Sequence, residues 1–151
     1  MLRLSKKMLF AIEAVLDIAY HAGSQPVQSR EITRRQEIPR RYLEQALQHL
    51  VRHGVLIGVR GPRGGYRLAR ERRRISLGDI VRVVRDMEPS DGLTQDAGLS
   101  ELGIKVVRPM WAKLQTNIMG ELDNISIDDL CDNAAKVDII SEGKINLDFS
   151  I

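Results

Sequence analysis

Cysteine, aromatic residues and long apolar runs are all scarce in this sequence of 151 residues. Its one cysteine cannot form an internal disulfide, and a single thiol does not by itself hold a zinc ion or an iron–sulfur centre. No apolar run approaches the about 20 residues that a membrane-spanning helix needs. The short run that starts at Met8 meets Glu13 almost at once, so no signal-peptide core is present. One Trp, three Tyr and two Phe are too few for the stacking platforms that bind single-stranded nucleic acid. We therefore expect a cytoplasmic protein, neither secreted nor embedded in a membrane.

The sequence does contain a strong asymmetry of charge. Residues 1–88 hold 18 basic and 9 acidic side chains, a net charge of +9, whereas residues 89–151 hold 5 and 11, a net charge of −6. A basic segment joined to an acidic one indicates that the first part meets a polyanion and the second does not. Both nucleic acid and an anionic membrane surface satisfy this charge pattern.

Three helices are predicted in the first 54 residues. Apolar residues recur at steps of three and four over residues 5–22, as on one face of a helix. Ser29 is a candidate N-cap for a short helix over about 30–35, and Pro39 suits the first position of a third helix that ends at Gly54. Two short helices joined by a tight turn are typical of a helix-turn-helix motif.

A β-hairpin is predicted to follow the third helix. Residues 55–60 are apolar and β-branched, residues 61–65 form a turn rich in glycine, and residues 66–69 return along the first strand. A hairpin in this place is the wing of a winged helix-turn-helix domain. Ser76 and Asp79 then form a capping box that begins another helix, which Pro89 ends.

The second part of the chain is predicted to contain a loop over 89–103 and a long helix with a short one over 104–133. The long helix carries an apolar seam at alternating steps of three and four, which most economically packs against a second copy of the chain. The residues of this predicted dimerisation seam are Ile104, Val107, Trp111, Leu114, Ile118, Leu122 and Ile125. In the tail, 134–151, alternating residues predict a possible β-hairpin between 137–140 and 145–151. The expected fold is thus mainly α with a small β-wing: a winged helix-turn-helix domain over 1–88, followed by a dimerisation helix.

Side chains suited to reading DNA lie off the buried stripe of the third helix. Arginine and glutamine match the edges of guanine and adenine, and glutamate can accept from the cytosine amino group. An arginine near the tip of the wing suits the focused negative potential of a minor groove. The predicted DNA-contacting residues are Lys6, Lys7, Arg40, Arg41, Tyr42, Glu44, Gln45, Gln48, Arg60 and Arg63. The alternative for the third helix is a solvated face with Arg–Glu pairs.

Four short motifs of the sequence resemble those of a known protein family. The sequences LRLSKK at 2–7, YLEQ at 42–45, VRGP at 59–62 and GGYRLA at 64–69 resemble the signature of the Rrf2 family. The members of this family are bacterial, dimeric winged-helix transcription regulators, and the similarity runs from residue 1 to about 131. The resemblance implies that Arg41, Glu44 and Gln45 read the major groove and that Arg60 enters the minor groove.

The same resemblance exposes a departure in the sensing region. Family members that bind an iron–sulfur cluster carry three cysteines before the long helix, and some carry a histidine three residues before its tryptophan. At the corresponding places, counted back from the tryptophan, this chain has Leu93, Leu99, Lys105 and Arg108. Some members add an oxygen ligand where this chain has Met8. Leucine cannot coordinate iron, and lysine and arginine are cationic at neutral pH. We expect no cluster of the family type and no other cofactor.

Three weaker candidates remain in the sequence. His49 and His53 stand one helical turn apart, but no third metal ligand is evident, and an exposed or DNA-facing pair is the favoured alternative. Cys131 has no adjacent basic residue to lower its pKa, so a buried, unreactive thiol is favoured over a redox switch. The tail is expected to be a simple packing strand, with an effector cover or a docking segment as alternatives.

The leading hypothesis is a homodimeric, sequence-specific DNA-binding transcription regulator, expected to be a repressor on a pseudo-palindromic operator. A winged-helix module that docks a partner protein is the first rival, although a surface of charge +9 would require an acidic partner. An enzyme is the second, but no catalytic constellation, phosphate loop or metal set can be assembled from the sequence.

Overall fold

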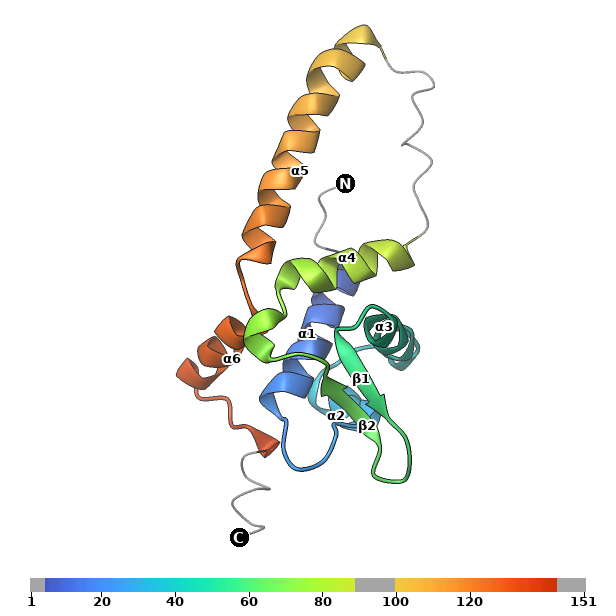
Figure 1. Cartoon of the computed structure of the whole chain (residues 1–151), viewed down its shortest axis with the longest axis vertical. Coiled ribbons are helices and arrows are strands. Elements are labelled where there is room, and N and C mark those ends of the chain that lie inside the picture. The colour runs from blue at the N-terminus through green and yellow to red at the C-terminus, as the bar shows by residue number, and fades with distance from the viewer. Residues whose placement is uncertain (1–4, 89–99, 144–151) are drawn as a thin grey trace.

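The protein is described here by a computed structural model, which covers residues 5–88 and 100–143 (Figure 1). It is mainly helical with one small antiparallel hairpin, as expected. In chain order the elements are α1 Lys6–Tyr20, α2 Ser29–Arg35, α3 Arg40–Arg52, β1 Leu56–Val59, β2 Gly65–Leu68, the 3-10 turn η1 Arg72–Arg74, α4 Leu77–Met87, the π-helical turn η3 Gly103–Val107, α5 Arg108–Asp123 and α6 Ile127–Lys136.

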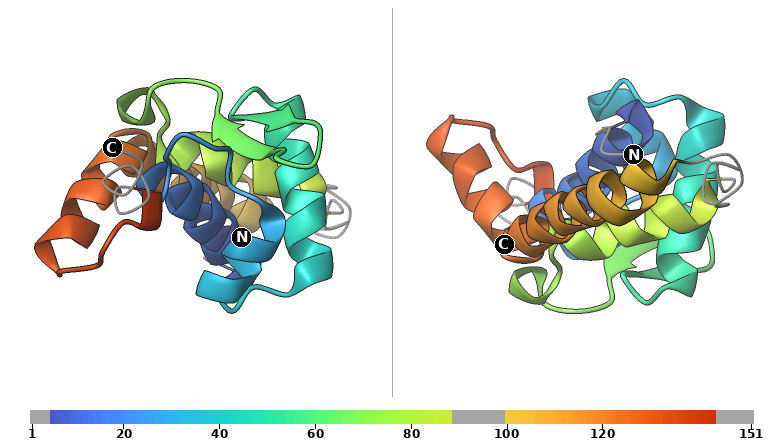
Figure 2. Two further views of the ribbon diagram at one scale, coloured as in Figure 1. Left: turned by 90° about the horizontal axis from the view of Figure 1, so that it is seen from below. Right: turned by 90° about the horizontal axis from the view of Figure 1, so that it is seen from above.

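Helix α1 lies at the centre of the hydrophobic core. Ser5 caps its start, because the Ser5 hydroxyl accepts a hydrogen bond from the main-chain N–H of Met8 at 3.3 Å. Ala11 and Val15 are wholly buried, and α1 is in contact with α3, α4 and α6. Figure 2 shows α3 and the hairpin on one side of the α1–α4 pair and α6 on the opposite side. The small side chains of α1 thus allow elements from both halves of the chain to approach it.

Helices α2 and α3 form the predicted helix-turn-helix, with two local differences. The N-cap of α2 is Gln28 and not Ser29, because the carboxylate of Glu31 reaches back to accept from the main-chain N–H of Gln28 at 2.8 Å. Pro39 precedes α3 as its N-cap instead of occupying its first turn. Strands β1 and β2 then pair in antiparallel register, with Leu56 opposite Leu68.

A short antiparallel contact joins the two halves of the molecule. It consists of two main-chain hydrogen bonds. The N–H of Leu77 donates to the carbonyl of Ile125 at 2.9 Å, and the N–H of Ile127 donates to the carbonyl of Ile75 at 2.8 Å. Ser76 and Ser126 lie between these hydrogen bonds as the N-caps of α4 and α6, and each forms a capping box, of which the one at Ser76 was predicted. Beyond this junction α5 projects away from the body of the protein (Figure 1).

Two expectations for the second half of the chain need correction. The predicted loop over 89–103 falls mostly outside the described residues, but residues 101–103 are already helical. The predicted strand over 137–140 is wrong. Helix α6 ends in a turn in which Asp138 has a φ of 64° and the N–H of Ile139 donates to the carbonyl of Ala134 at 3.2 Å. These main-chain groups close the helix, so they do not form a ladder, and the proposed partner strand at 145–151 lies outside the described residues.

One buried ion pair ties α1 to α2. Asp17 is 2% exposed, and its carboxylate accepts two hydrogen bonds from the Arg35 guanidinium, at 2.9 and 2.8 Å. The side-chain amide of Gln36 adds a third donor at 3.1 Å. Burial of a charge is tolerated only when it is paired and hydrogen-bonded in this way.

Removal of this carboxylate should destabilise the fold. Asp17→Ala leaves the Arg35 guanidinium, whose side chain is 9% exposed, without its main partner. The free energy of unfolding should fall by about 3–5 kcal/mol, measured by urea titration. The matched control is Glu71→Ala, which breaks the exposed pair with Arg73 and should cost under about 1 kcal/mol. Equal unfolding midpoints for the two variants would contradict this role of Asp17.

Candidate nucleic-acid interface

Helix α3 divides into a buried and an exposed face, as its sequence predicts. Leu43, Ala46, Leu47 and Leu50 are buried in the core. Five side chains of the predicted site point outward from the rest of the helix: Arg40, Arg41, Glu44, Gln45 and Gln48. They span the N-terminal two thirds of α3, the part of a recognition helix that enters a major groove.

These exposed side chains differ in whether they already have an ion-pair or hydrogen-bond partner in the chain. Arg40 and Glu44 form an ion pair at 3.2 Å, with 83% and 53% of their side chains exposed. Such an exposed pair is worth under about 1 kcal/mol, so either side chain can exchange it for a base or a phosphate. Within the described residues, Arg41, Gln45 and Gln48 show no hydrogen bond or ion pair. These three therefore present free donors and acceptors to a ligand.

Tyr42, unlike the other predicted DNA-contacting residues of α3, is bound to α1. Its hydroxyl donates to the main-chain carbonyl of Lys7 at 2.5 Å, and its ring packs at a tilt against Phe10 with 6.0 Å between centroids. Burial, followed by the charge of Glu88, raises the pKa of Tyr42 to about 12. Tyr42 thus joins the start of α3 to the start of α1 and does not stand on the outer face. As a consequence, the exposed Lys6 and Lys7 lie beside the start of α3.

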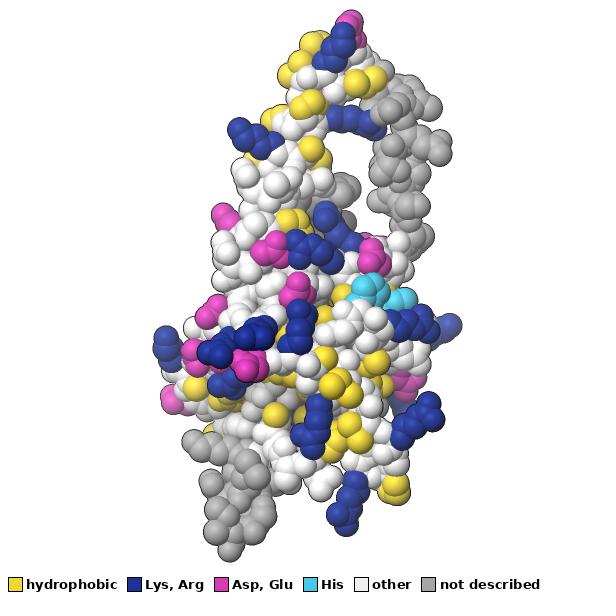
Figure 3. All heavy atoms as spheres, viewed as in Figure 1, with side chains coloured by type: hydrophobic (Ala, Val, Ile, Leu, Met, Phe, Trp, Pro, Cys, Tyr) yellow, Lys and Arg dark blue, Asp and Glu magenta, His cyan; other side chains and the backbone are white. Residues whose placement is uncertain are grey.

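The wing arginines stand in solvent at the end of the hairpin. Arg60 and Arg63 are exposed and make no hydrogen bond or ion pair with other described residues. Arg67 is fixed instead, because its guanidinium donates to the main-chain carbonyl of Ser24 at 2.9 Å. Dark-blue basic side chains project from the part of the molecule that carries the hairpin (Figure 3).

Gln28 is a residue of this region that the sequence reading missed. Its side-chain amide donates to the carbonyl of Pro62 in the wing turn at 3.4 Å and accepts from Arg30 at 2.6 Å. The main chain of Val27 pairs with that of Tyr66, with N···O distances of 3.0 and 2.8 Å. The segment before α2 therefore holds the wing. Only the Gln28–Glu31 capping spacing offered a sequence signal for it.

The two histidines and the cysteine make contacts within the fold. The two rings of His53 and His49 are 6.5 Å apart, and His53 contacts the carboxylate of Asp86 at 3.1 Å and the carbonyl of His49 at 2.8 Å. Among the residues the structure describes, no three potential ligands gather to hold a metal ion. Cys131 is buried, as favoured from the sequence, and burial raises the pKa of its thiol. The expectation that no basic residue lies beside it is wrong, because Arg72 from η1 contacts the thiol and acts to lower its pKa, but the effect of burial is larger. A raised pKa disfavours the reactive thiolate.

The fold and this surface define a winged helix-turn-helix DNA-binding protein. The sequence profile of the Rrf2 family, described as iron-dependent transcriptional regulators, matches residues 4–133. The chain belongs to the Rrf2 family. It is 32% identical over 139 residues to the HTH-type transcriptional regulator IscR of Sodalis glossinidius, covering 92% of this chain and 84% of the relative. IscR of Cronobacter sakazakii is 33% identical, with 91% and 85% covered.

Solved structures give the same assignment. T. potens IscR superposes with a TM-score of 0.72 at 34% identity, over 93% of each chain. CymR, the global cysteine regulator of B. subtilis, superposes with a TM-score of 0.68 at 26% identity, over 88% of this chain and 98% of that one. The protein is accordingly a DNA-binding transcriptional regulator, and its family is one of regulators and not of enzymes. No helix in the described ranges is long and apolar enough to cross a bilayer.

Proposed function

We propose that two copies of this chain form a homodimer that represses transcription from a pseudo-palindromic operator in the bacterial cytoplasm, without an iron–sulfur cluster. One observation carries the DNA-binding part of the proposal. The free polar face of α3 and the unpaired arginines of the wing belong to one basic domain, held together by the Val27 and Gln28 contacts. A helix for the major groove beside an arginine for the minor groove is the geometry of winged-helix readout.

Each predicted contact has a distinct role in this arrangement. Arg41, Glu44 and Gln45 read base edges in the major groove, with Arg40 and Gln48 at either end of that surface. Lys6 and Lys7 neutralise phosphates, which positions the helix but carries no sequence information. Tyr42 acts through its hydrogen bond to Lys7 and sets the angle between α1 and α3.

The apolar surface of α5 and of the turn before it supports the homodimer. Six of the seven seam residues are between 37% and 53% exposed in the single chain: Ile104, Val107, Trp111, Leu114, Ile118 and Ile125. The seventh, Leu122, packs with Met119 on the core of its own chain. Three further exposed apolar residues lie near the start of this helix: Leu102, Val106 and Met110. So much apolar surface on a projecting helix is typical of a protein interface.

The wing can be tested with a charge-matched pair of variants. Sheared genomic DNA retained by the tag-free protein at about physiological salt should yield sites that share an inverted repeat. On such a site Arg60→Ala should weaken binding by about 10- to 100-fold, roughly 1–3 kcal/mol, as measured by fluorescence anisotropy. Arg73→Ala, an equal loss of charge at an ion-paired residue of η1, is the control and should change affinity little. Equal losses in both variants would remove the wing from base recognition, and retention of no DNA would favour a partner protein.

The seam can be tested on the same helix. Leu114→Glu places a charge within the predicted interface and should convert the dimer to monomer in sedimentation equilibrium. Thr116→Glu adds the same charge at an exposed position whose hydroxyl contacts only the carbonyl of Ala112 among described residues, so its dimer should persist. Both positions are exposed in the single chain, so the fold should survive in both variants. A Leu114→Glu dimer as stable as the wild type would refute the seam.

The donor set of this chain does not fit a cluster of the family type. Lys105 is exposed and bound to Glu101 at 2.5 Å, and Cys131 is buried in α6. Anaerobic reconstitution with ferrous iron and sulfide should therefore give no visible charge-transfer band, with the thiol-free Cys131→Ala variant as the control for iron sulfide that adheres without a thiolate ligand. Stoichiometric iron and sulfide with a band that disappears in that variant would overturn this part of the proposal.

A further inference from the structure

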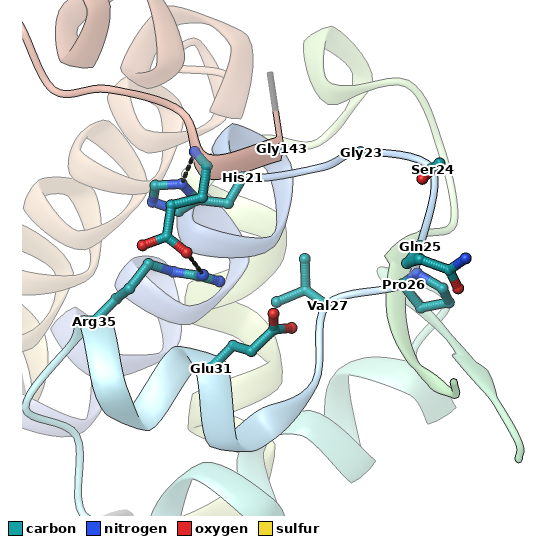
Figure 4. A pocket seen from close by; sticks show the side chains of 10 residues that line it. His21, Gly23, Ser24, Gln25, Pro26, Val27, Glu31, Arg35 and Gly143 are labelled. Atoms are coloured by element: carbon teal, nitrogen blue, oxygen red, sulfur yellow. Dashed lines mark hydrogen bonds and ion pairs between the residues drawn. The ribbon is translucent and has the colours of Figure 1, made fainter. Parts of the chain in front are cut away.

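The segment after α6 folds back onto the end of α1 through hydrogen bonds that each join a side chain to a main-chain group (Figure 4). The hydroxyl of Tyr20 donates to the carbonyl of Ile139, and the hydroxyl of Ser141 donates to the carbonyl of Tyr20 at 2.6 Å. The main-chain N–H of Glu142 donates to Nδ1 of His21 at 3.0 Å. Residues 139–143, named the clasp below, are thus bound to Tyr20 at the end of α1 and to His21, its C-cap.

The side chain of Glu142 joins the clasp to the first helix of the helix-turn-helix. One of its carboxylate oxygens accepts from Arg34 at 2.7 Å and from Arg35 at 2.6 Å. Arg35 is held independently by Asp17 on its other side. Release of the clasp therefore leaves the Arg35–Asp17 pair intact, and the clasp can open without unfolding of the domain.

The clasp closes tightly at its end. A Cβ atom added to Gly143 would lie 2.2 Å from the carbonyl oxygen of Ala22 and 2.4 Å from that of His21, so only glycine fits. A cavity of about 290 Å³ opens beside this contact and is lined by His21, Arg35 and Glu142 (Figure 4). Solvent protons therefore have access to the His21 ring.

We propose that the clasp is a pH-sensitive latch, closed while the Nδ1 atom of His21 is unprotonated and released when that atom gains a proton. A main-chain N–H can only donate, so the Glu142 contact requires a lone pair on Nδ1. Protonation makes both ring nitrogens donors, so the N–H of Glu142 would then face a second donor at Nδ1. The latch would link the C-terminal segment to α2, and the proposal requires neither DNA nor a dimer.

Charged groups of both signs face His21. Asp17 in α1 and Glu142 in the clasp favour the protonated ring, whereas Arg34 and Arg35 in α2 disfavour it. The edge of the Tyr20 ring also packs against the imidazole, with 5.4 Å between centroids. Burial is the largest influence and lowers the pKa of His21 from its ordinary 6.5.

The sign of the pH effect follows from this direction. The opened form binds the proton more readily than the closed form, so the clasp is fully stabilised above about pH 6.5 and loses stability as pH falls through the lowered pKa of His21. The Arg34 and Arg35 guanidinium groups hold the pKa of Glu142 below its ordinary 4.5. The carboxylate therefore stays charged from pH 5 to 8, where the ring changes state.

Amide hydrogen exchange of the full chain, read by ¹⁵N–¹H NMR between pH 5 and 8, tests the latch. After correction for the intrinsic exchange rate, protection of the Glu142 amide should be constant above pH 7. It should fall by up to about tenfold per pH unit as pH drops below about 6.5, where the opened form gains a proton that the closed form does not, and level off below the lowered pKa of His21. The lower end of this window should match the titration of the His21 ring in the same samples.

Two variants separate the latch from general effects of acid. His21→Asn keeps an oxygen acceptor close to the Nδ1 position and cannot titrate, so its Glu142 protection should be independent of pH. His49→Asn, which replaces a histidine outside the clasp, should behave as the wild type. Gly143→Ala should leave the Glu142 amide unprotected at every pH. A pH-dependent loss that persists in His21→Asn, or wild-type protection that stays constant through the ring titration, would overturn the proposal.

Discussion

The antiparallel contact between residues 75–77 and 125–127 fixes the orientation of α5 relative to the winged helix-turn-helix domain. Its two crossed hydrogen bonds bring the capped ends of α4 and α6 together. Beside it, the Arg82 guanidinium donates two hydrogen bonds of 2.7 Å to the carboxylate of Asp123. A Cβ atom added to Gly78 would lie 1.8 Å from that carboxylate. The start of α4 and the end of α5 are therefore locked in one orientation. In the proposed dimer through α5, this orientation would set the separation of the two α3 helices, and so the half-site spacing.

The buried Asp17 carboxylate supplies the second constraint, within the DNA-binding domain itself. It holds Arg35, which in turn meets Glu142, so a chain of charges runs from α1 through α2 to the C-terminal segment. Breaking such a network at its buried member costs far more than at an exposed one. The orientation of α2, against which α3 packs, thus depends on a carboxylate that touches no predicted DNA contact.

Local signals in the sequence predicted most of the elements, and contacts between distant residues account for what was missed. The leucine stripe of α3 and the Ser76 capping box are short-range patterns, and both are present in the structure. The hydrogen bond from Tyr42 to Lys7 spans 35 positions and leaves no periodic trace. The strand predicted at 137–140 failed because alternation of side chains carries no information about whether a partner strand lies alongside. Placement of Gln28 against the wing likewise required the tertiary structure.

A signal to this chain, under the proposed absence of a cluster, would use chemistry other than thiolate ligation. Lys105 stands at a place where cluster-binding members of the family carry a cysteine, and it is already paired with Glu101. A signal that reaches α2 has a direct route into the helix-turn-helix. The clasp provides such a route, because Glu142 contacts both Arg34 and Arg35 while its N–H depends on the protonation of His21. A proton gained at the end of α1 thereby loosens the support of the helix on which α3 rests, with no change to the DNA-facing side chains themselves.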